Sequence, residues 1–483
     1  MSDVTIIVTS AVGLYALLTG CYLILENRRP QASLAWMLAF IFAPGIGLIV
    51  YILFGRPTKA FSRQTDLLKQ DLEGDVRPLL KERREREDAE LANLASKGFG
   101  HQKLVMLIRR NSASGLTTGN QVEIQQDAKV FYPSLLEDMK AARHSIHLQY
   151  FIWASDDCTR QFMQVMADKA HAGVAVRLLY DSMGSHAHLR RRDLEMLKSA
   201  GVRVAPTSPL YRLHTISYRN HRKITVIDGV IGYTGGMNIG REHLDGGQGF
   251  DSWRDTQVRI VGEAAAMLQA VFMVDWYNAV RENLFLPQYY PSPSVPPTAT
   301  GEAVQVLASG PDSEWAAIRQ LYFAMIVSAR RRVCLQSPYF VIDATLAEAL
   351  AAASMAGVDV RIMITERPSG NPLPGWAANT FMAEVAAAGA KVFLYRKGYL
   401  HAKTISIDGE ICSIGSANID IRSFSINYEL NAVLYSSRLA QELEAQFEAD
   451  LQECIPFDAD AYRRSSLGLR LRDSVARLLS PLL

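Results

Sequence analysis

The feature that most constrains the fold is an internal repeat. The segments HRKITVIDGVIGYTGGMNIG, which begins at His221, and HAKTISIDGEICSIGSANID, which begins at His401, share nine of twenty positions without a gap. Upstream, AGVAVRLLYD resembles AGVDVRIMIT, and HLQYFI resembles CLQSPYFV, in the same order. A repeat of this length indicates two domains of one kind.

Each copy predicts an α/β domain, because runs rich in Val, Ile and Leu alternate with longer Ala-, Leu- and Glu-rich stretches of helical character. Residues 120–285 form the first predicted domain and residues 304–456 the second. The segment 286–303 between them is rich in proline, which favours a linker. Two similar domains of one chain usually pack about a pseudo-twofold axis, so we expect equivalent residues to meet in one central cleft.

Residues 4–25 and 31–54 contain no charged side chain, and each run is long enough to cross a hydrocarbon core of roughly 30 Å as a helix. They predict a two-helix transmembrane hairpin over residues 1–57, and a buried core hairpin is the alternative. Residues 58–119 predict a charged helical linker. Basic residues follow the second run, which favours a cytoplasmic position for the large domains. Five scattered cysteines agree with a reducing compartment.

The overall charge argues against a general nucleic-acid binder. The chain has 51 Lys and Arg residues against 49 Asp and Glu residues, a net charge of +2. Proteins that bind nucleic acid usually carry a strong basic field. We therefore expect no nucleic-acid partner.

Each repeat carries a His, a Lys two residues later, an Asp five residues beyond the Lys, and an Asn seventeen residues after the His. The two sets are His221, Lys223, Asp228 and Asn238, and His401, Lys403, Asp408 and Asn418. Residues two apart in a strand point to the same face, so each His and Lys share one space. Two His and two Lys can supply a nucleophile, an acid and cationic clamps for a phosphodiester. No metal or cofactor is expected.

The paired motifs resemble those of the phospholipase D superfamily, whose two HxKxxxxD sequences form one site. More narrowly, the apolar PGIGLIVYILFGR, SWRDT, SPYF, LHAKT and RSFSINYELN segments resemble the bacterial cardiolipin synthase family. The resemblance implies two phospholipase D-type α/β domains and a bacterial inner-membrane location. It also implies phosphatidyl transfer from one phosphatidylglycerol to another, which yields cardiolipin and glycerol through a phosphatidyl-histidine. Anionic membrane lipids are the expected partners.

Roles for individual residues follow from this chemistry. The resemblance implies His221 as nucleophile and His401 as acid, although the residues alone leave that choice open. Asn238, Ser416 and Asn418 are expected to bind the phosphate through hydrogen bonds. Asp255 and Glu429 are the candidates for fixing the histidine tautomers. Asp228 and Asp408 belong to the motifs, but we expect them mainly to stabilise loops.

Three other functions and one further segment stay open at this point. A hydrolytic phospholipase D would differ only in its acceptor, a nuclease would need a basic groove, and a scaffold would have no need of both His and both Lys. Residues 457–483 predict a basic amphipathic helix with leucines at helical spacing. It would rest on anionic lipid or dock against the protein's own core.

Overall fold

The computed structural model describes residues 14–15, 17–25, 30–51, 91–92, 100–208, 217–247, 249–289 and 301–480. The chain divides into two units. One comprises residues 1–60 with 209–217, and the other comprises residues 61–208 with 218–483.

The N-terminal unit contains short helices. Residues 17–25 are helical, and α2 (Pro30–Phe42) is followed at once by α3 (Pro44–Val50). Proline lacks an amide N–H and clashes with the preceding turn, which explains the break at Pro44. Across the described part of the chain, every helix is too short or too polar to span a bilayer. The expected span 31–54 is thus divided where it is described, and much of the expected span 4–25 lies outside the described residues.

The second unit holds both repeats, and its elements alternate between strand and helix as the sequence predicts. The first repeat contains α6 (Gln102–Ser112), β1 (Leu116–Gln126), α7 (Ala128–Ala141), β2 (Ser145–Tyr150), α8 (Asp157–His171), β3 (Ala175–Asp181), α9 (Ser182–Ser185), α10 (Arg191–Ser199), β4 (Arg203–Thr207), β5 (Ile224–Ile227), β6 (Ile231–Gly235), α11 (Glu242–Asp245), β7 (Trp253–Arg254), β8 (Thr256–Val261), α12 (Glu263–Val280) and η3 (Pro287–Tyr289).

The second repeat has the same plan. It contains β9 (Glu302–Ser309), α13 (Ala317–Ser328), β10 (Arg332–Ser337), β11 (Phe340–Val341), α14 (Ala344–Met355), β12 (Asp359–Thr365), α15 (Leu373–Ala387), β13 (Lys391–Tyr395), β14 (Tyr399–Leu400), β15 (Thr404–Ile407), β16 (Ile411–Gly415), β17 (Ile419–Asp420), α16 (Ile421–Ser425), β18 (Glu429–Tyr435), α17 (Ser437–Leu451), β19 (Cys454–Pro456), α18 (Ala459–Arg463) and α19 (Leu467–Leu478).

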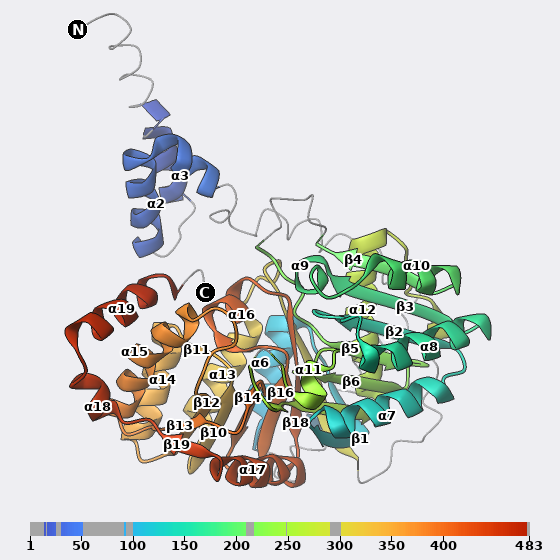
Figure 1. Ribbon diagram of the computed structural model, residues 1–483. Helices are drawn as coiled ribbons and strands as arrows, with labels where there is room; N and C mark the ends of the chain where they lie inside the picture. Colours follow the sequence, from blue (N-terminus) through green and yellow to red (C-terminus); the bar gives the residue numbers. More distant parts are fainter. Residues whose placement is uncertain are drawn as a thin grey trace, which may run out of the picture. The chain divides into compact units, whose positions relative to one another are not determined.

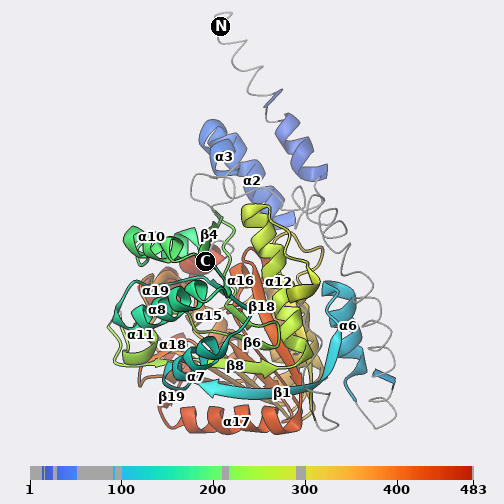
Figure 2. The same ribbon diagram turned by 90° about the vertical axis from the view of Figure 1, so that its right-hand side faces the viewer.

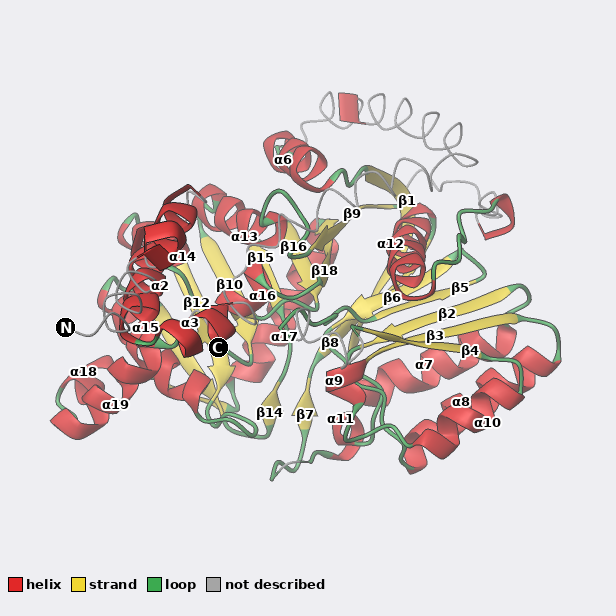
Figure 3. Cartoon of the chain, turned by 90° about the horizontal axis from the view of Figure 1, so that it is seen from above, coloured by secondary structure: helices red, strands yellow, loops and turns green. Residues whose placement is uncertain are grey.

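Fifteen of the described strands form one continuous sheet (Figures 1 and 3). From its centre outward, one side reads β1, β8, β6, β5, β2, β3, β4. The other side reads β9, β18, β16, β15, β10, β12, β13, with β19 added at the edge. The two orders correspond strand by strand, as a pseudo-twofold axis between β1 and β9 requires.

The long strand β1 joins the two repeats. It pairs antiparallel with β8 from Gln121 to Gln126 (Figure 2), and its first residues pair antiparallel with β9. Because backbone hydrogen bonds cross from repeat to repeat here, the repeats share a sheet instead of sitting as separate bodies on a linker.

Helix caps and apolar side chains explain the order of the elements. Asp156 and Thr159 form a reciprocal capping box at the start of α8, and Asp343 caps α14 by accepting the Leu346 N–H at 3.0 Å. One core lies among α7, α8, β2 and β3, and an equivalent core lies among α13, α14, α15, β10 and β12. The central core joins α12 and α17 to the middle strands. These three cores hold the motif strands β5 and β15 rigidly.

The predicted amphipathic helix at the C-terminus is present as α19, and it docks against the protein while it leaves an apolar stripe exposed. Its charged side docks on α15, where Arg477 lies over Phe381 with 4.2 Å from guanidinium carbon to ring centroid. Asp473 accepts a hydrogen bond from Asn379 at 2.9 Å. The opposite side exposes a stripe of apolar residues, Leu467, Leu471, Val475 and Leu478.

Candidate active site

The two motif histidines precede equivalent strands and are held by hydrogen bonds that cross between the repeats. The His221 N–H donates to the carbonyl oxygen of Tyr428 at 2.9 Å. The His401 N–H donates to the carbonyl oxygen of Arg254 at 2.7 Å, beside the paired strands β7 and β14. Tyr428 and Arg254 directly precede the acidic residues Glu429 and Asp255. Each histidine is therefore placed beside the carboxylate of the other repeat.

The side chains of the two histidines also contact the carboxylates of the opposite repeats. Nδ1 of His401 lies 2.6 Å from Asp255 Oδ2, and Nδ1 of His221 lies 3.1 Å from Glu429 Oε2. Both carboxylates are fully buried. A carboxylate at Nδ1 holds a proton there and leaves the lone pair on Nε2, the nitrogen that a nucleophile needs.

Different neighbours hold the two carboxylates. Asp255 accepts the Thr256 N–H at 2.8 Å, and a Cβ atom at Gly236 would come within 2.0 Å of Asp255 Oδ1. Glu429 accepts the hydroxyl of Ser416, the residue equivalent to Gly236, and the amide of Asn427 at 3.2 Å. The hydroxyl of Ser416, expected on the phosphate, thus donates to the orienting carboxylate instead. A serine beside an anionic acceptor satisfies that nearer charge.

Both motif lysines are fully buried, and the nearby carboxylates Asp255 and Glu429 partly offset the effect of burial on each. The ammonium of Lys223 donates to the His221 carbonyl oxygen at 2.6 Å, and that of Lys403 donates to the His401 carbonyl oxygen. Burial lowers the pKa of Lys223 to about 7 and that of Lys403 to about 8. Burial, with help from Lys403, Lys223 and His221, also holds the pKa of His401 well below its usual value. Cationic groups that are this deeply buried are stabilised in their charged form when an anion binds beside them.

The other predicted residues fall into two groups. The amide oxygen of Asn238 accepts the Ile152 N–H at 3.1 Å, whereas the amide oxygen of Asn418 has no hydrogen-bond partner among the described residues. Asp228 and Asp408 follow β5 and β15, so they lie at the opposite ends of these strands from the histidines. Each Asp accepts three backbone N–H groups at the start of a neighbouring strand: residues 143–145 for Asp228 and residues 330–332 for Asp408.

The sequence did not point to the ring cluster around His401. The rings of Trp253, Tyr399 and His243 lie 5.7, 5.7 and 5.8 Å from the His401 ring, centroid to centroid. His243 occupies the position of Ser423 in the other repeat, so the duplication carried no signal for it. A search for repeat positions with unequal residues could have found it.

One group in the site offers metal-ligand atoms. His243, Asp255 and His401 each present one such atom, all within 4.8 Å of one another. Burial lowers the pKa of His243 to about 3, and His401, Lys403 and Lys223 add to this effect. The positive charge of the two lysines opposes a divalent cation at this position.

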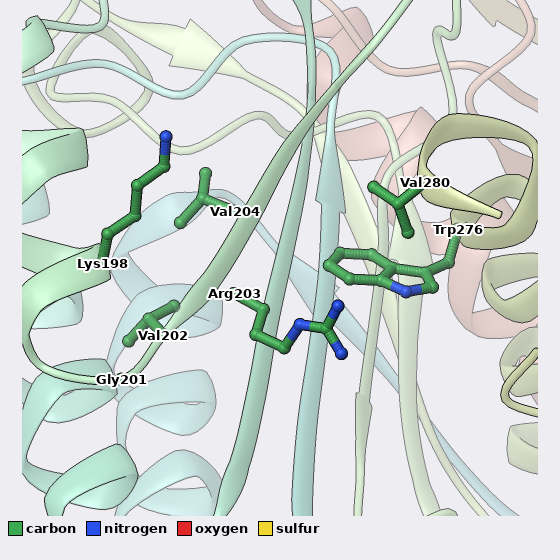
Figure 4. A pocket seen from close by; sticks show the side chains of 7 residues that line it. All are labelled: Lys198, Gly201, Val202, Arg203, Val204, Trp276 and Val280. Atoms are coloured by element: carbon green, nitrogen blue, oxygen red, sulfur yellow. The ribbon is translucent and has the colours of Figure 1, made fainter. Parts of the chain in front are cut away.

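A pocket of about 340 Å³ lies elsewhere, between β4 and the end of α12 (Figure 4). There the guanidinium of Arg203 lies 5.6 Å from the ring centroid of Trp276 and also pairs with Glu282. None of the predicted site residues lines this pocket. We place the site at the paired histidines, because the titratable groups converge there.

Comparison with known proteins agrees with this geometry. The family model described as "Cardiolipin synthase, PLD-like domain" matches residues 135–276 and 322–451, and "Phospholipase_D-nuclease N-terminal" matches residues 14–56. The "Cardiolipin synthase" of Oceanobacillus iheyensis is 38% identical over 468 residues, which cover 95% of each chain. The "Major cardiolipin synthase ClsA" of Bacillus subtilis is 37% identical over 465 residues, again 95% of each chain.

Among solved structures, the phosphatidylserine synthase of Haemophilus influenzae shares the fold. The match has a TM-score of 0.59 at 14% identity and covers 75% of this chain and 95% of that one. The crossed histidine–carboxylate pairs, the two-part family match and the near full-length relatives lead to one conclusion. The chain belongs to the cardiolipin synthase family of phospholipase D-like proteins.

Proposed function

We propose that this chain is a cardiolipin synthase, which transfers the phosphatidyl group of one phosphatidylglycerol to the terminal hydroxyl of a second and releases glycerol. The observation that carries the proposal is the convergence of two histidines, each beside the other repeat's carboxylate, with two buried lysines. Relatives named for this activity match the chain along nearly its whole length.

In the first step, Nε2 of His221 attacks the phosphorus of the donor. The P–N bond forms, the P–O bond to glycerol breaks, and His401 gives a proton to the departing oxygen. The bound phosphate anion raises the low pKa of His401, so this residue is protonated in the complex. In the second step, the acceptor hydroxyl gives its proton to His401 and attacks phosphorus, and the P–N bond breaks. His221 is assigned as nucleophile from its place in the first motif, and the opposite assignment gives the same products.

The remaining residues stabilise charge. Lys223 and Lys403 hold the non-bridging phosphate oxygens, and the amides of Asn238 and Asn418 hydrogen-bond to the phosphate. Asp255 and Glu429 fix the histidine tautomers and stabilise the imidazolium forms. An anionic phosphate between the lysines raises the pKa of each ammonium, so substrate binding itself keeps them charged. No step of this chemistry uses a metal or a cofactor.

The proposal includes a bacterial inner-membrane location, with residues 4–25 and 31–54 as a two-pass anchor and the repeats on the cytoplasmic side. The match of residues 14–56 to a phospholipase D N-terminal family supports it. So do apolar side chains such as Leu25 and Phe42, which are 79% and 82% exposed. The exposed leucine stripe of α19, with arginines on the same helix, fits an anionic lipid surface.

Lipid analysis tests the function. The purified full chain is incubated in phosphatidylglycerol vesicles with EDTA, beside His221→Ala and His401→Ala. We expect cardiolipin and free glycerol in equal amounts from the native chain and neither product from the variants. Phosphatidic acid without cardiolipin would instead identify a hydrolase, and turnover that survives either substitution would exclude the two-histidine mechanism.

A further inference from the structure

Two arginines beside His221 differ sharply in their partners. Arg222 has every guanidinium nitrogen bonded: Nη1 to Asp275 at 2.7 Å, Nε to the Glu429 carbonyl oxygen and Nη2 to the Ser309 carbonyl oxygen. Arg219 is equally buried, at 6% exposed, yet neither of its terminal nitrogens has a hydrogen-bond partner among the residues that the structure describes. A buried guanidinium without acceptors is unfavourable unless a ligand supplies them.

The carboxylate of Asp181 pairs with Arg219 but does not accept a hydrogen bond from it. Asp181 Oδ1 lies 3.7 Å from Nη1 of Arg219, which is an ion pair too long for a hydrogen bond. Asp181 already accepts the N–H groups of Met183, Gly184 and Asn220. Its oxygens are therefore committed to the backbone, and the donors of Arg219 stay unmatched.

The backbone of Arg219 pairs with the segment that carries Glu429, and a second arginine lies on that segment. Arg219 precedes His221 by two residues, and its carbonyl oxygen accepts the Tyr428 N–H at 2.8 Å. Arg422 stands at the start of the turn that leads to Tyr428, where its carbonyl oxygen accepts the Ile426 N–H. The pKa of Arg219 is lowered by burial, and the positive charge of Arg422 lowers it further while Asp181 raises it. The backbone segments that carry the two arginines therefore meet at Tyr428, beside His221.

The equivalent positions of the other repeat carry no cation. The offset of 180 residues that relates His221 to His401 relates Arg219 to Tyr399 and Arg422 to Glu242. The ring of Tyr399 stacks near that of His401. Burial raises the pKa of Tyr399, and Tyr339, Asp255 and, least, Glu242 add to this effect. An extra anion would thus be attracted at the His221 end of the cleft and repelled at the His401 end.

We infer that Arg219 and Arg422 form a second phosphate subsite, which holds the phosphate of the acceptor lipid while its terminal hydroxyl attacks. This inference rests on the proposed synthase function. Cardiolipin contains two phosphates joined by one glycerol, so an acceptor phosphatidylglycerol must bring its own anion close to the reacting phosphorus. Glycerol and water bring none. The subsite therefore selects the lipid acceptor over both.

Two reactions of the full chain separate this role from a structural one. Cardiolipin formation needs the acceptor phosphate, whereas exchange of radiolabelled glycerol into phosphatidylglycerol uses the same donor and the same histidines without it. We expect Arg219→Gln and Arg422→Gln to reduce cardiolipin formation about tenfold to a hundredfold, as loss of a charge-assisted hydrogen bond does. Glycerol exchange should fall less than threefold, and Arg219→Lys should recover part of the lost cardiolipin formation.

Glu242→Gln is the matched control, because it changes a charge at the equivalent position of the other repeat, and both reactions should stay within twofold of native. Equal losses in both reactions for Arg219→Gln and Arg422→Gln would show a structural role and overturn the subsite, as would no loss in either. Should Arg219→Gln fail to fold, Arg422→Gln decides, since this side chain is less buried. A native chain that makes no cardiolipin would instead overturn the proposed function.

Discussion

Around His401 the site is lined by three rings, whereas one ring contacts His221 and arginines stand in the chain segments beside it. Trp253, Tyr399 and His243 surround the His401 ring, but the His221 ring meets Phe151 at 4.9 Å between centroids, with Arg219 two residues away. The backbone plan is nevertheless the same on both sides. The shared backbone plan therefore places the two histidines equivalently, and the unequal residues around them give the two ends of the cleft different chemistry.

The carboxylates Asp255 and Glu429 also differ between the two ends, because their pKa values are shifted in opposite directions. The pKa of Asp255 is raised by burial. Burial also opposes ionisation of Glu429, but His221, Lys223 and Ser416 outweigh it and lower the pKa of this carboxylate. Glu429 is therefore the firmer anion, and it faces the histidine that we assign as nucleophile. A neighbouring anion stabilises the cationic phospho-imidazole that forms when a neutral histidine attacks phosphorus.

The largest effect that tests this comparison is the loss of either histidine. We expect His221→Ala and His401→Ala each to lower cardiolipin formation at least about 10³-fold, because one removes the nucleophile and the other the acid. A phosphatidyl donor with a p-nitrophenyl leaving group needs no acid in the first step. With it, His401→Ala should release one p-nitrophenolate per chain in a burst, and His221→Ala should release none. The reverse result would assign the nucleophile to His401.

Replacing Asp255 and Glu429 tests whether the two carboxylates act differently on their histidines. We expect Asp255→Asn and Glu429→Gln each to lower kcat/KM about a hundredfold, because an amide no longer fixes the tautomer. Only Glu429→Gln should also move the acid limb of the pH profile. The pKa of His221 is lowered by burial, and Glu429 is what raises it, so removing that charge lowers the pKa further. Neutral His221 then persists to lower pH, and kcat/KM should hold to lower pH; an unchanged limb would contradict this.

Much of this site could be predicted from the sequence, because the duplicated HxK pattern identified both histidines and both lysines. The pattern placed each pair within a strand, and this was wrong: residues 221–223 and 401–403 lie just before β5 and β15. The carboxylates Asp255 and Glu429 were predicted as well. Their exchange between repeats was not, since it depends on backbone pairing of Tyr428 and Arg254 with the opposite chain segment. The sequence predicted Ser416 as a phosphate ligand, which stays a prediction, and it could not show that the Ser416 hydroxyl donates to Glu429.

The fold, too, could be predicted only in part from the sequence. The alternation of strand and helix predicted two α/β domains, and their strands occur as expected. The proline-rich segment predicted a linker between two domains. In the structure β1 also pairs with β9, so the two repeats share one sheet. Strand pairing between distant segments leaves no local sequence pattern. Arg219 was missed because a repeat-based search favours residues shared by both copies, and Arg219 is unique to one.

The lysines give a smaller effect in pH dependence. In the chain without substrate, the pKa is about 7 for Lys223 and about 8 for Lys403, so raising the pH through this range removes the charges that attract phosphate. We expect kcat/KM to fall about tenfold per pH unit between pH 7 and 8, where Lys223 loses its charge, and about a hundredfold per unit above pH 8, where both lysines do. Bound phosphate raises both pKa values, so the alkaline limb of kcat should lie at higher pH. Coincident limbs for kcat and kcat/KM would contradict the role of the lysines.

The smallest effect concerns Asp228 and Asp408, where the two repeats are alike. Each carboxylate accepts three backbone N–H groups, and each residue has a positive φ, 52° and 56°. Asparagine keeps this backbone conformation but loses the charge, so Asp228→Asn and Asp408→Asn should each lower the free energy of unfolding by about 1–3 kcal/mol. Thermal unfolding of the full chain measures this.

Asp157→Asn is the control for this pair, because its carboxylate is 73% exposed and pairs only with Arg160 on the surface of α8. It should change stability by less than about 0.5 kcal/mol. Since Asp228 and Asp408 stand at the far ends of β5 and β15 from the histidines, folded variants should keep cardiolipin formation within about threefold of native. A much larger loss of activity in only one of the two variants, at equal stability, would show that the repeats differ at these positions too, and would assign that Asp a part in the chemistry.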